Sequence, residues 1–263
     1  MNLQQLYRRF RDSKGVSTDS RKIRAGQIFF ALKGPNFNGN TYAEAALEKG
    51  ALLAVVDDPD QVKNSQYLLV DHGLEALQQL ANFHRRQVAI KALLGITGST
   101  GKTTTKELVS SVLSAKYKVS TTAENFNNHI GVPLSLLKIK DDHDLAIIEM
   151  GASNPGDISE LCKIAQPDHG IITNIGRAHL EGMGGLEGVK KTKSALYKHV
   201  INRKGTLIID NQETSLIDIT PNYEKIFAPT LDIAVMANDP FLLLEYQDTG
   251  RLYKIQTQLT GVY

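Results

Sequence analysis

The sequence predicts an α/β protein in which a small N-terminal α/β unit precedes a P-loop unit with a mostly parallel sheet and late antiparallel strands. Short apolar runs alternate with helical patterns almost throughout the 263 residues, as in layered α/β architectures. Continuous apolar runs such as residues 145–150 suit parallel strands that are covered on both faces. A chain of this length has room for about two domains, each with its own core.

The elements of the N-terminal unit follow one another closely. We expect helices over residues 3–10, 42–49 and 73–86, and strands within residues 26–34, 51–56 and 67–70. In the last helix, Leu74, Leu77 and Leu80 recur on one face with the period of 3.6 residues. The pattern then restarts with a strong strand, so we assign residues 1–86 to a first domain and residues 87–263 to a second.

The second unit begins with a strand that runs directly into a Gly/Ser/Thr loop and a helix. We expect strands over residues 91–97, 118–121, 144–150, 170–173, 205–210, 241–246 and 251–258. We expect helices over residues 102–115, 132–137, 157–165 and 186–200. Polar and apolar residues alternate in the last strand, which indicates that the late strands are antiparallel.

Composition and charge exclude several classes of protein. The 30 Lys and Arg residues nearly balance the 28 Asp and Glu residues, so nucleic acid is not an expected partner. The single cysteine, Cys162, excludes an internal disulfide and a Cys-cluster metal site, and fits a reducing compartment. No apolar stretch approaches the roughly 18 residues of a membrane span, and the N-terminal residues lack the apolar core of a signal peptide. We therefore expect a cytoplasmic enzyme without membrane insertion.

The best local signal is the run GITGSTGKTTT between a strand and a helix. Gly98 and Gly101 allow the backbone to wrap phosphates, whose negative charge the helix N-terminus favours. Lys102 would meet the β- and γ-phosphates, and the Thr103 hydroxyl would face Mg²⁺. The strict P-loop template fails at Ile96, which stands where its first glycine belongs. The alternative is a Gly-rich turn between strand and helix that binds nothing.

A nucleotide site of this type needs an acid for its metal ion. Glu149 ends an apolar strand, at the carboxyl edge where parallel sheets bind ligands. Mg²⁺ prefers one or two carboxylates together with phosphate oxygens. The alternative is a surface carboxylate at the end of a strand. A sheet shared with the phosphate loop favours the metal site.

Four motifs occur in order along the second unit: GITGSTGKTTTKE, AENFNNHIGVPLSLL, AIIEMGASNPGDI and TNIGRAHLEGMGGLEGV. Together they resemble the ATP-dependent Mur ligases of peptidoglycan synthesis. The combination resembles the type that adds D-alanyl-D-alanine (D-Ala-D-Ala) to UDP-N-acetylmuramoyl-tripeptide (UDP-MurNAc-tripeptide). Near the N-terminus, STDSR and GQIFFALKGPNFNGNTYAEAALEKGA resemble the UDP-binding domain of this family. The resemblance implies an ATP-dependent amide-bond ligase that works through an acyl phosphate.

The resemblance also implies binding roles for individual residues. It assigns ATP binding to Gly98, Ser99, Thr100, Gly101, Lys102, Thr103, Thr104 and Asn128. It assigns binding of the UDP-muramyl substrate to Ser20, Arg21, Lys33, Gly34, Phe37, Asn38, Gly39, Asn125 and Asn127. Judged from the residues alone, the Asn-rich loop could instead serve turn formation, and Arg21 an ordinary surface ion pair.

By the same resemblance, the catalytic residues are Lys102, Glu149, His179 and Lys193, and the Mg²⁺ ligands are Thr103, Glu149, His179 and a carbamylated Lys193. Lys190 and Lys191 lie close enough to Lys193 for a different register. Ser194 and Ala195 stand where the family often has Gly-Glu. The alternative for these lysines is a solvated basic face of a helix.

Two other functions stay open at this point. One is another Mur-type ligase that adds a single amino acid such as diaminopimelate. The other is a nucleotide-binding module with little turnover, because the family continues beyond the element that ends at Tyr263 into a further domain. We therefore expect the second domain to be incomplete at its C-terminal end and the third domain to be absent. We expect a monomer that acts on UDP-MurNAc-tripeptide and D-Ala-D-Ala with ATP and Mg²⁺.

Overall fold

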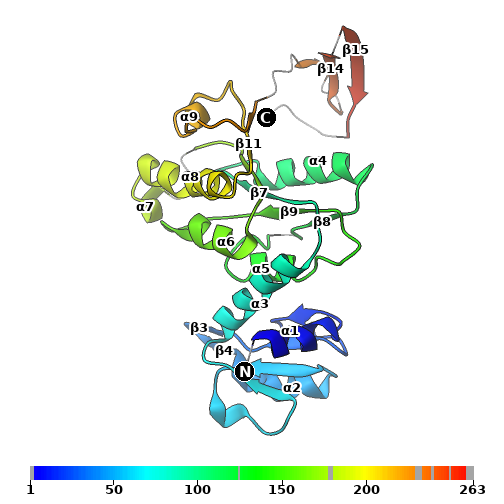
Figure 1. Cartoon of the computed structure of the whole chain (residues 1–263), viewed down its shortest axis with the longest axis vertical. Coiled ribbons are helices and arrows are strands. Elements are labelled where there is room, and N and C mark those ends of the chain that lie inside the picture. The colour runs from blue at the N-terminus through cyan, green and yellow to red at the C-terminus, as the bar shows by residue number, and fades with distance from the viewer. Residues whose placement is uncertain are drawn as a thin grey trace.

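The computed structural model describes residues 3–123, 125–176, 180–228, 233–237, 240–248 and 250–258. Figure 1 shows the N-terminal sheet at one end of the longest axis, a larger sheet in the middle, and the late strands β14 (Leu243–Asp248) and β15 (Arg251–Gln256) at the other end. Parallel sheets and late antiparallel strands confirm the predicted fold class. None of the described helices is long and apolar enough to cross a bilayer.

The N-terminal sheet has four parallel strands in the order β1-β2-β5-β6. These strands are β1 (Val16–Ser17), β2 (Ile28–Phe30), β5 (Leu53–Val56) and β6 (Tyr67–Leu69). The helical segments are α1 (Leu3–Arg11), η1 (Gly39–Tyr42), α2 (Ala43–Glu48), η2 (Pro59–Gln61) and α3 (Gly73–Gln87). A small hairpin of β3 (Lys33–Gly34) and β4 (Phe37–Asn38) follows β2. Strands β2 and β5 are buried along their whole length, which explains their unbroken apolar sequences.

The middle sheet has six parallel strands in the order β12-β11-β10-β7-β9-β8. These strands are β7 (Ala92–Thr97), β8 (Val119–Thr121), β9 (Leu145–Glu149), β10 (His169–Ile172), β11 (Thr206–Ile208) and β12 (Ile226–Phe227). The helices are α4 (Lys102–Ser114), α5 (Gly131–Leu136), α6 (Asp157–Ala165), α7 (Leu180–Met183), α8 (Leu186–Asn202) and α9 (Thr214–Ile217). Since β7 pairs with both β9 and β10, the loop after β7 opens beside the ends of two neighbouring strands.

The sequence pattern missed several elements, and most of them are short. Strands β1, β3, β4 and β12 have two residues each, and helices α7 and α9 have four, which is too few to display a period. The remaining one is β13 (Ile233–Ala237), which pairs with β14 in an antiparallel sheet. All five of its residues are exposed. They are also all apolar, so the sequence shows no alternation of polar and apolar residues that would indicate a strand.

Helix α3 connects the two parallel sheets. Its residues Leu77, Leu80 and Ala81 are fully buried, as the predicted stripe requires. They belong to a hydrophobic cluster that also includes Phe10 of α1 and Leu136 of α5. In Figure 1, α3 lies between the N-terminal sheet and the helices α5 and α6 on the near face of the middle sheet. The two units therefore share packing through this helix.

The carboxylate of Asp168, just before β10, connects three of the packed elements by hydrogen bonds. One oxygen of Asp168, Oδ2, accepts hydrogen bonds from the Leu93 backbone N–H at 2.8 Å and from Arg85 Nη2 at 2.6 Å. The other, Oδ1, accepts from Arg203 Nη2 at 3.2 Å. These bonds connect the end of α3, the second residue of β7 and the C-terminal end of α8.

We expect the substitution Asp168→Asn to destabilise the fold. The Arg85 side chain is only 10% exposed, so its charge would lose a close partner in a poorly solvated position. Because Asp168 itself is 29% exposed, we expect the free energy of unfolding to fall by about 2–4 kcal/mol, less than for a fully buried pair. Denaturant titration measures this loss.

The matched control is Asp142→Asn, which removes the exposed ion pair with Lys118. This change should cost less than about 1 kcal/mol. Equal losses in the two variants would contradict the role given to Asp168.

Candidate active site

The loop between β7 and α4 has a backbone that requires glycine at two positions. Gly98 has a φ of +152°, and a Cβ at this position would lie 1.9 Å from Thr173 Oγ1. Gly101 caps α4 in the left-handed conformation, with a φ of +75°. Ile96 is fully buried within β7, so the position where the strict template has its first glycine lies inside the strand. The first N–H groups of α4 have no partner within the helix, as in anion-binding helix N-termini.

The segment after β10 holds this loop in place. Asn174 accepts a hydrogen bond from the Thr100 N–H at 3.0 Å and donates to Thr100 Oγ1 at 2.9 Å. The Ser99 Oγ accepts from the Gly176 N–H at 2.8 Å. Thr173 Oγ1 donates to the Thr100 carbonyl at 2.6 Å. Our sequence reasoning assigned no role to Asn174 or Thr173, although both lie in or beside the TNIG motif.

Two lysine ammonium groups meet at one backbone carbonyl of the loop. Lys102 Nζ donates to the Gly98 oxygen at 2.8 Å, and Lys193 Nζ donates to the same oxygen at 2.9 Å. Burial lowers the pKa of Lys102, although the nearby Glu149 charge opposes this shift. Burial, together with the charge of Lys102, lowers the pKa of Lys193 to about 8. The pair forms a concentrated positive charge next to the helix N-terminus.

The neighbouring lysines of α8 lie differently. Lys193 is 3% exposed, whereas Lys190 forms an ion pair with Glu187 at 3.2 Å and Lys191 is exposed. Of these three lysines, Lys193 is the one that reaches the phosphate loop. His179, the other expected ligand from this region, lies outside the described residues.

Glu149 lies at the end of β9 and is 1% exposed. Its Oε2 accepts a hydrogen bond from Thr103 Oγ1 at 2.9 Å, and its Oε1 accepts from Asn127 Nδ2 at 2.8 Å. The structure thus brings together a strand-end acid, the first turn of α4 and the Asn-rich loop. Carboxylate and hydroxyl oxygens are the donors that Mg²⁺ prefers, so the residues present fit this ion.

The other residues of the Asn-rich loop and of the first turn of α4 have different surroundings. Asn128 Oδ1 accepts hydrogen bonds from the Ile130 and Gly131 N–H groups at 3.1 and 2.9 Å, as in the turn formation that the sequence allowed. Asn125 is exposed, and so is Thr104 on α4.

Lys106, a buried lysine that the sequence did not single out, contacts the residue that bonds to the backbone of Glu149. Lys106 is 1% exposed and donates from Nζ to the Thr122 carbonyl at 2.7 Å, while Glu107 provides a counter-charge at 2.8 Å. Thr122 Oγ1 in turn accepts from the Glu149 N–H at 3.0 Å. The sequence feature that could have identified Lys106 is its position four residues after Lys102, which places both on one face of α4.

The expected substrate residues of the N-terminal unit form a separate group. Ser20, Arg21 and Phe37 line a pocket of about 460 Å³ with Tyr42, which sequence reasoning missed. Phe37 and Tyr42 are exposed and stack with ring centroids 5.6 Å apart. Arg21 binds Asp19 at 2.9 and 3.0 Å, which lowers the pKa of Asp19 to about 2. The ion pair left open as an alternative therefore exists, at the edge of an aromatic pocket.

Of the remaining expected residues, Lys33 contacts Asp57, which follows β5. Burial of Asp57 opposes its ionisation, but bonds from the Gly73 N–H, Asn40 and Lys33 hold its pKa below the usual value. Lys33 Nζ lies 3.0 Å from Asp57 Oδ1.

The hairpin beside Asp57 is locally fixed. Asn38 caps η1, and Gly34 lies in β3. A Cβ at Gly39 would lie 2.4 Å from the Leu32 carbonyl oxygen, so only glycine fits there.

Two family models match the chain. The model of the Mur ligase middle domain matches residues 96–248, and the model of the Mur ligase family, catalytic domain, matches residues 12–85. The UDP-N-acetylmuramoyl-tripeptide–D-alanyl-D-alanine ligase of Bacillus subtilis is 40% identical over 204 residues. That match covers 77% of this chain and 44% of the relative, so the chain spans less than half the length of this relative.

Solved structures agree with this similarity. A crystal structure of MurF from Acinetobacter baumannii has a TM-score of 0.84 and 29% identity, and the match covers 99% of this chain and 61% of that chain. MurF ligase from Thermotoga maritima in complex with ADP has a TM-score of 0.81 and 29% identity, covering 95% and 59% of the two chains.

We expect Lys106→Met to weaken ADP binding about tenfold, because Thr122 would lose its buried donor and the Glu149 network would loosen. The binding of UDP, in the other unit, should be unchanged. Isothermal titration of both nucleotides measures the two affinities. Lys106→Arg, which keeps a cationic donor, should recover part of the loss.

The matched control is Lys116→Met, at an exposed position beyond the end of the same helix. It should alter neither affinity. If Lys106→Met lowers only the unfolding midpoint and leaves ADP binding intact, Lys106 does not position the site.

Proposed function

The chain belongs to the Mur ligase family, and from this membership we propose that it carries the substrate-binding and ATP-binding parts of a ligase that joins D-Ala-D-Ala to UDP-MurNAc-tripeptide. The observation that carries the proposal is the meeting of Lys102 and Lys193 at the Gly98 carbonyl. One buried and one half-buried ammonium group beside a helix N-terminus need an anion, and a polyphosphate is the anion that fits a P-loop.

The proposal divides the work between the two units. Residues 1–86 would bind the uridine diphosphate of the muramyl substrate through the pocket of Ser20, Arg21 and Phe37. Residues 87–263 would bind ATP at the phosphate loop. The proposed setting is the cytoplasm, with the protein acting on small molecules as a monomer.

A carboxylate is a poor electrophile, so the reaction needs two steps. In the first, an oxygen of the substrate carboxylate bonds to the γ-phosphorus of ATP while the bond from that phosphorus to the ADP oxygen breaks. In the second, the amine of D-Ala-D-Ala attacks the acyl carbon, phosphate leaves and the amine loses a proton. Lys102 and the N–H groups of α4 stabilise the negative charge on the phosphate oxygens in the first step.

Glu149 and Thr103 would hold Mg²⁺, together with His179 and a carbamylated Lys193. When bound, the ion neutralises charge on the phosphate oxygens. The lowered pKa of Lys193, about 8, supports its modification, because only the neutral amine adds CO₂. Starting from the ammonium, addition of CO₂ would form an N–C bond and release two protons, so an anionic oxygen ligand would replace a cationic donor to Gly98.

The first test removes the positive charge of Lys102, on which the proposed phosphate site rests. We expect Lys102→Met to weaken ATP binding by about 10- to 100-fold, because a hydrogen bond to a charged phosphate is lost. UDP binding should stay within twofold of the unchanged chain. Isothermal titration with each nucleotide measures both, and equal ATP affinity in the two proteins would refute the phosphate site.

The second test concerns the acceptor. A full-length ligase that contains these two units should release ADP when UDP-MurNAc-tripeptide and D-Ala-D-Ala are both present, and mass spectrometry should find the pentapeptide product. A single amino acid such as diaminopimelate should not replace the dipeptide. Equal ADP release with the amino acid would favour another Mur-type ligase.

A further inference from the structure

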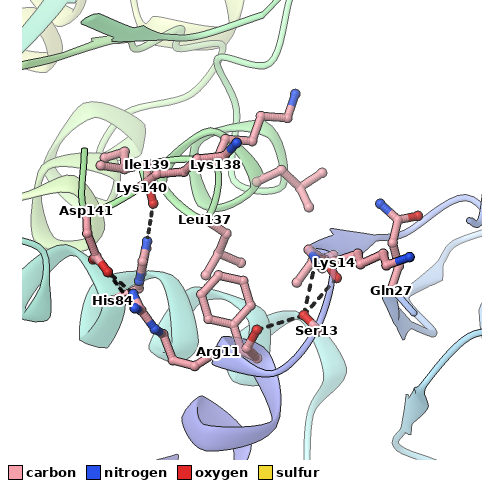
Figure 2. A pocket seen from close by; sticks show the side chains of 14 residues that line it. Arg11, Ser13, Lys14, Gln27, His84, Leu137, Lys138, Ile139, Lys140 and Asp141 are labelled. Carbon is pink, nitrogen blue, oxygen red and sulfur yellow. Dashed lines mark hydrogen bonds and ion pairs between the residues drawn. The ribbon is translucent and has the colours of Figure 1, made fainter. Parts of the chain in front are cut away.

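A second large pocket lies between the two units, on the side away from the uridine diphosphate site. It has a volume of about 580 Å³, within the range of small-molecule sites. Figure 2 shows that Arg11, Ser13 and Lys14 approach it from the N-terminal unit, and that residues 137–141 approach it from the segment after α5. His84 of α3 lies between them.

The chain topology separates this pocket from the proposed substrate site. Lys14, Gly15 and Val16 lie at the amino end of β1, and Gln27 immediately precedes β2. The residues Lys33, Phe37 and Asp57 instead follow the carboxyl ends of β2 and β5. The two pockets therefore open at opposite ends of the N-terminal sheet.

The rim of the pocket carries positive charge that the protein does not neutralise. Arg11 and Asp141 pair with each other across the two units, through Nη1–Oδ1 at 3.0 Å and a second Nη2–Oδ2 contact. Lys14, Lys138 and Lys140 are exposed and form no ion pair within the described part of the chain. Three lysines thus surround a cavity whose single acidic side chain, Asp141, is already engaged.

Two of these lysines have defined surroundings. The Lys14 side chain lies along Gly26, where a Cβ would meet its Cδ at 3.2 Å. The Lys138 ammonium lies 5.3 Å from the centroid of the Phe126 ring. Both stems are therefore directed by contacts with the protein.

The floor of the pocket is apolar and has no charge of its own. Phe10, Leu137 and Ile139 are each less than a tenth exposed and line it. His84 Nε2 lies 2.8 Å from the Ile139 carbonyl oxygen. Burial lowers the pKa of His84, which favours the neutral ring. An apolar floor under a cationic rim suits an amphiphilic anion.

We propose that this interdomain pocket binds a small organic phosphate, with its ring on Phe10 and Leu137 and its phosphate among Lys14, Lys138 and Lys140. Such a ligand would contact both units at once, since Lys14 belongs to one and Lys138 and Lys140 to the other. Its binding energy would therefore favour the relative orientation of the units in which these lysines line one pocket.

Pyridoxal 5′-phosphate is a suitable probe, because it is an aromatic phosphate whose aldehyde condenses with a lysine amine, with loss of water. Borohydride then reduces the imine, and peptide mass spectrometry identifies each labelled lysine in the intact 263-residue chain. Labelling of Lys14, Lys138 or Lys140 should saturate with probe concentration. Labelling of the exposed Lys116 and Lys163 should rise linearly. Identification by peptide separates this pocket from Lys102 and Lys193 of the phosphate loop.

Competition and substitution decide the chemical class. AMP should slow labelling in the pocket at least tenfold, inorganic phosphate should protect less, and pyridoxal without phosphate should show no preference. The double variant Lys14→Ala/Lys140→Ala should reduce labelling of Lys138 at least fivefold and leave Lys102 unchanged. The control pair Lys116→Ala/Lys163→Ala should have no effect on Lys138.

Three results would overturn the proposal: linear labelling of the pocket lysines, no protection by AMP, or labelling of Lys138 that is unaffected by the double variant. Equal protection by AMP and inorganic phosphate would overturn the assignment of a ring to the apolar floor. None of these readouts depends on ATP binding or ligase activity, so failure here leaves the proposed function untouched.

Discussion

The main physical feature of the candidate active site is the repulsion between the ammonium groups of Lys102 and Lys193, which both donate to the Gly98 carbonyl. Because both nitrogens lie within hydrogen-bond distance of the Gly98 oxygen, they are within about 6 Å of each other, which corresponds to roughly 3 kcal/mol of repulsion at an effective dielectric constant of about 20. The negative charge of the nearby Glu149 partly offsets this repulsion at Lys102. The arrangement favours whatever anion enters the loop.

The second constraint is the connection between the two units. Helix α3 starts beside Asp57, which follows β5, and ends at the Arg85–Asp168 ion pair next to the middle sheet. Between these ends, Gln78 donates to the His129 carbonyl at 3.1 Å, next to the Asn-rich loop. A substrate with one end in each unit requires a fixed spacing, and a helix with buried contacts on both sides provides it.

Local spacing in the sequence identified much of this site. The glycines, Lys102 and Thr103 form one short motif, and Glu149 ends an apolar strand, so each was visible without tertiary information. The fold class followed from long periodic segments.

Asn174 and Lys106 were not identified, because their roles depend on partners that only the fold brings near, and polar residues in loops and helices have many uses. Tyr42 belongs to the same group, since it acts through stacking on Phe37. The pocket between the units was also invisible, because Lys14 and Lys140 are 126 positions apart and belong to different units.

The hydrogen bonds of the loop also explain how it can bind a nucleotide without refolding. Lys102 donates to two neutral carbonyls, those of Gly98 and Ser99, at 2.8 and 3.2 Å. The ammonium–carbonyl bonds are already charge-assisted, but a phosphate oxygen adds attraction between opposite charges, so exchanging one of these carbonyls for a phosphate oxygen is favourable. The backbone of the loop need not move in this exchange, because Asn174 and Thr173 hold Thr100 independently of Lys102. The lysine therefore changes partners within a loop whose shape is already set, and the cost of ordering the site is met by folding rather than by binding.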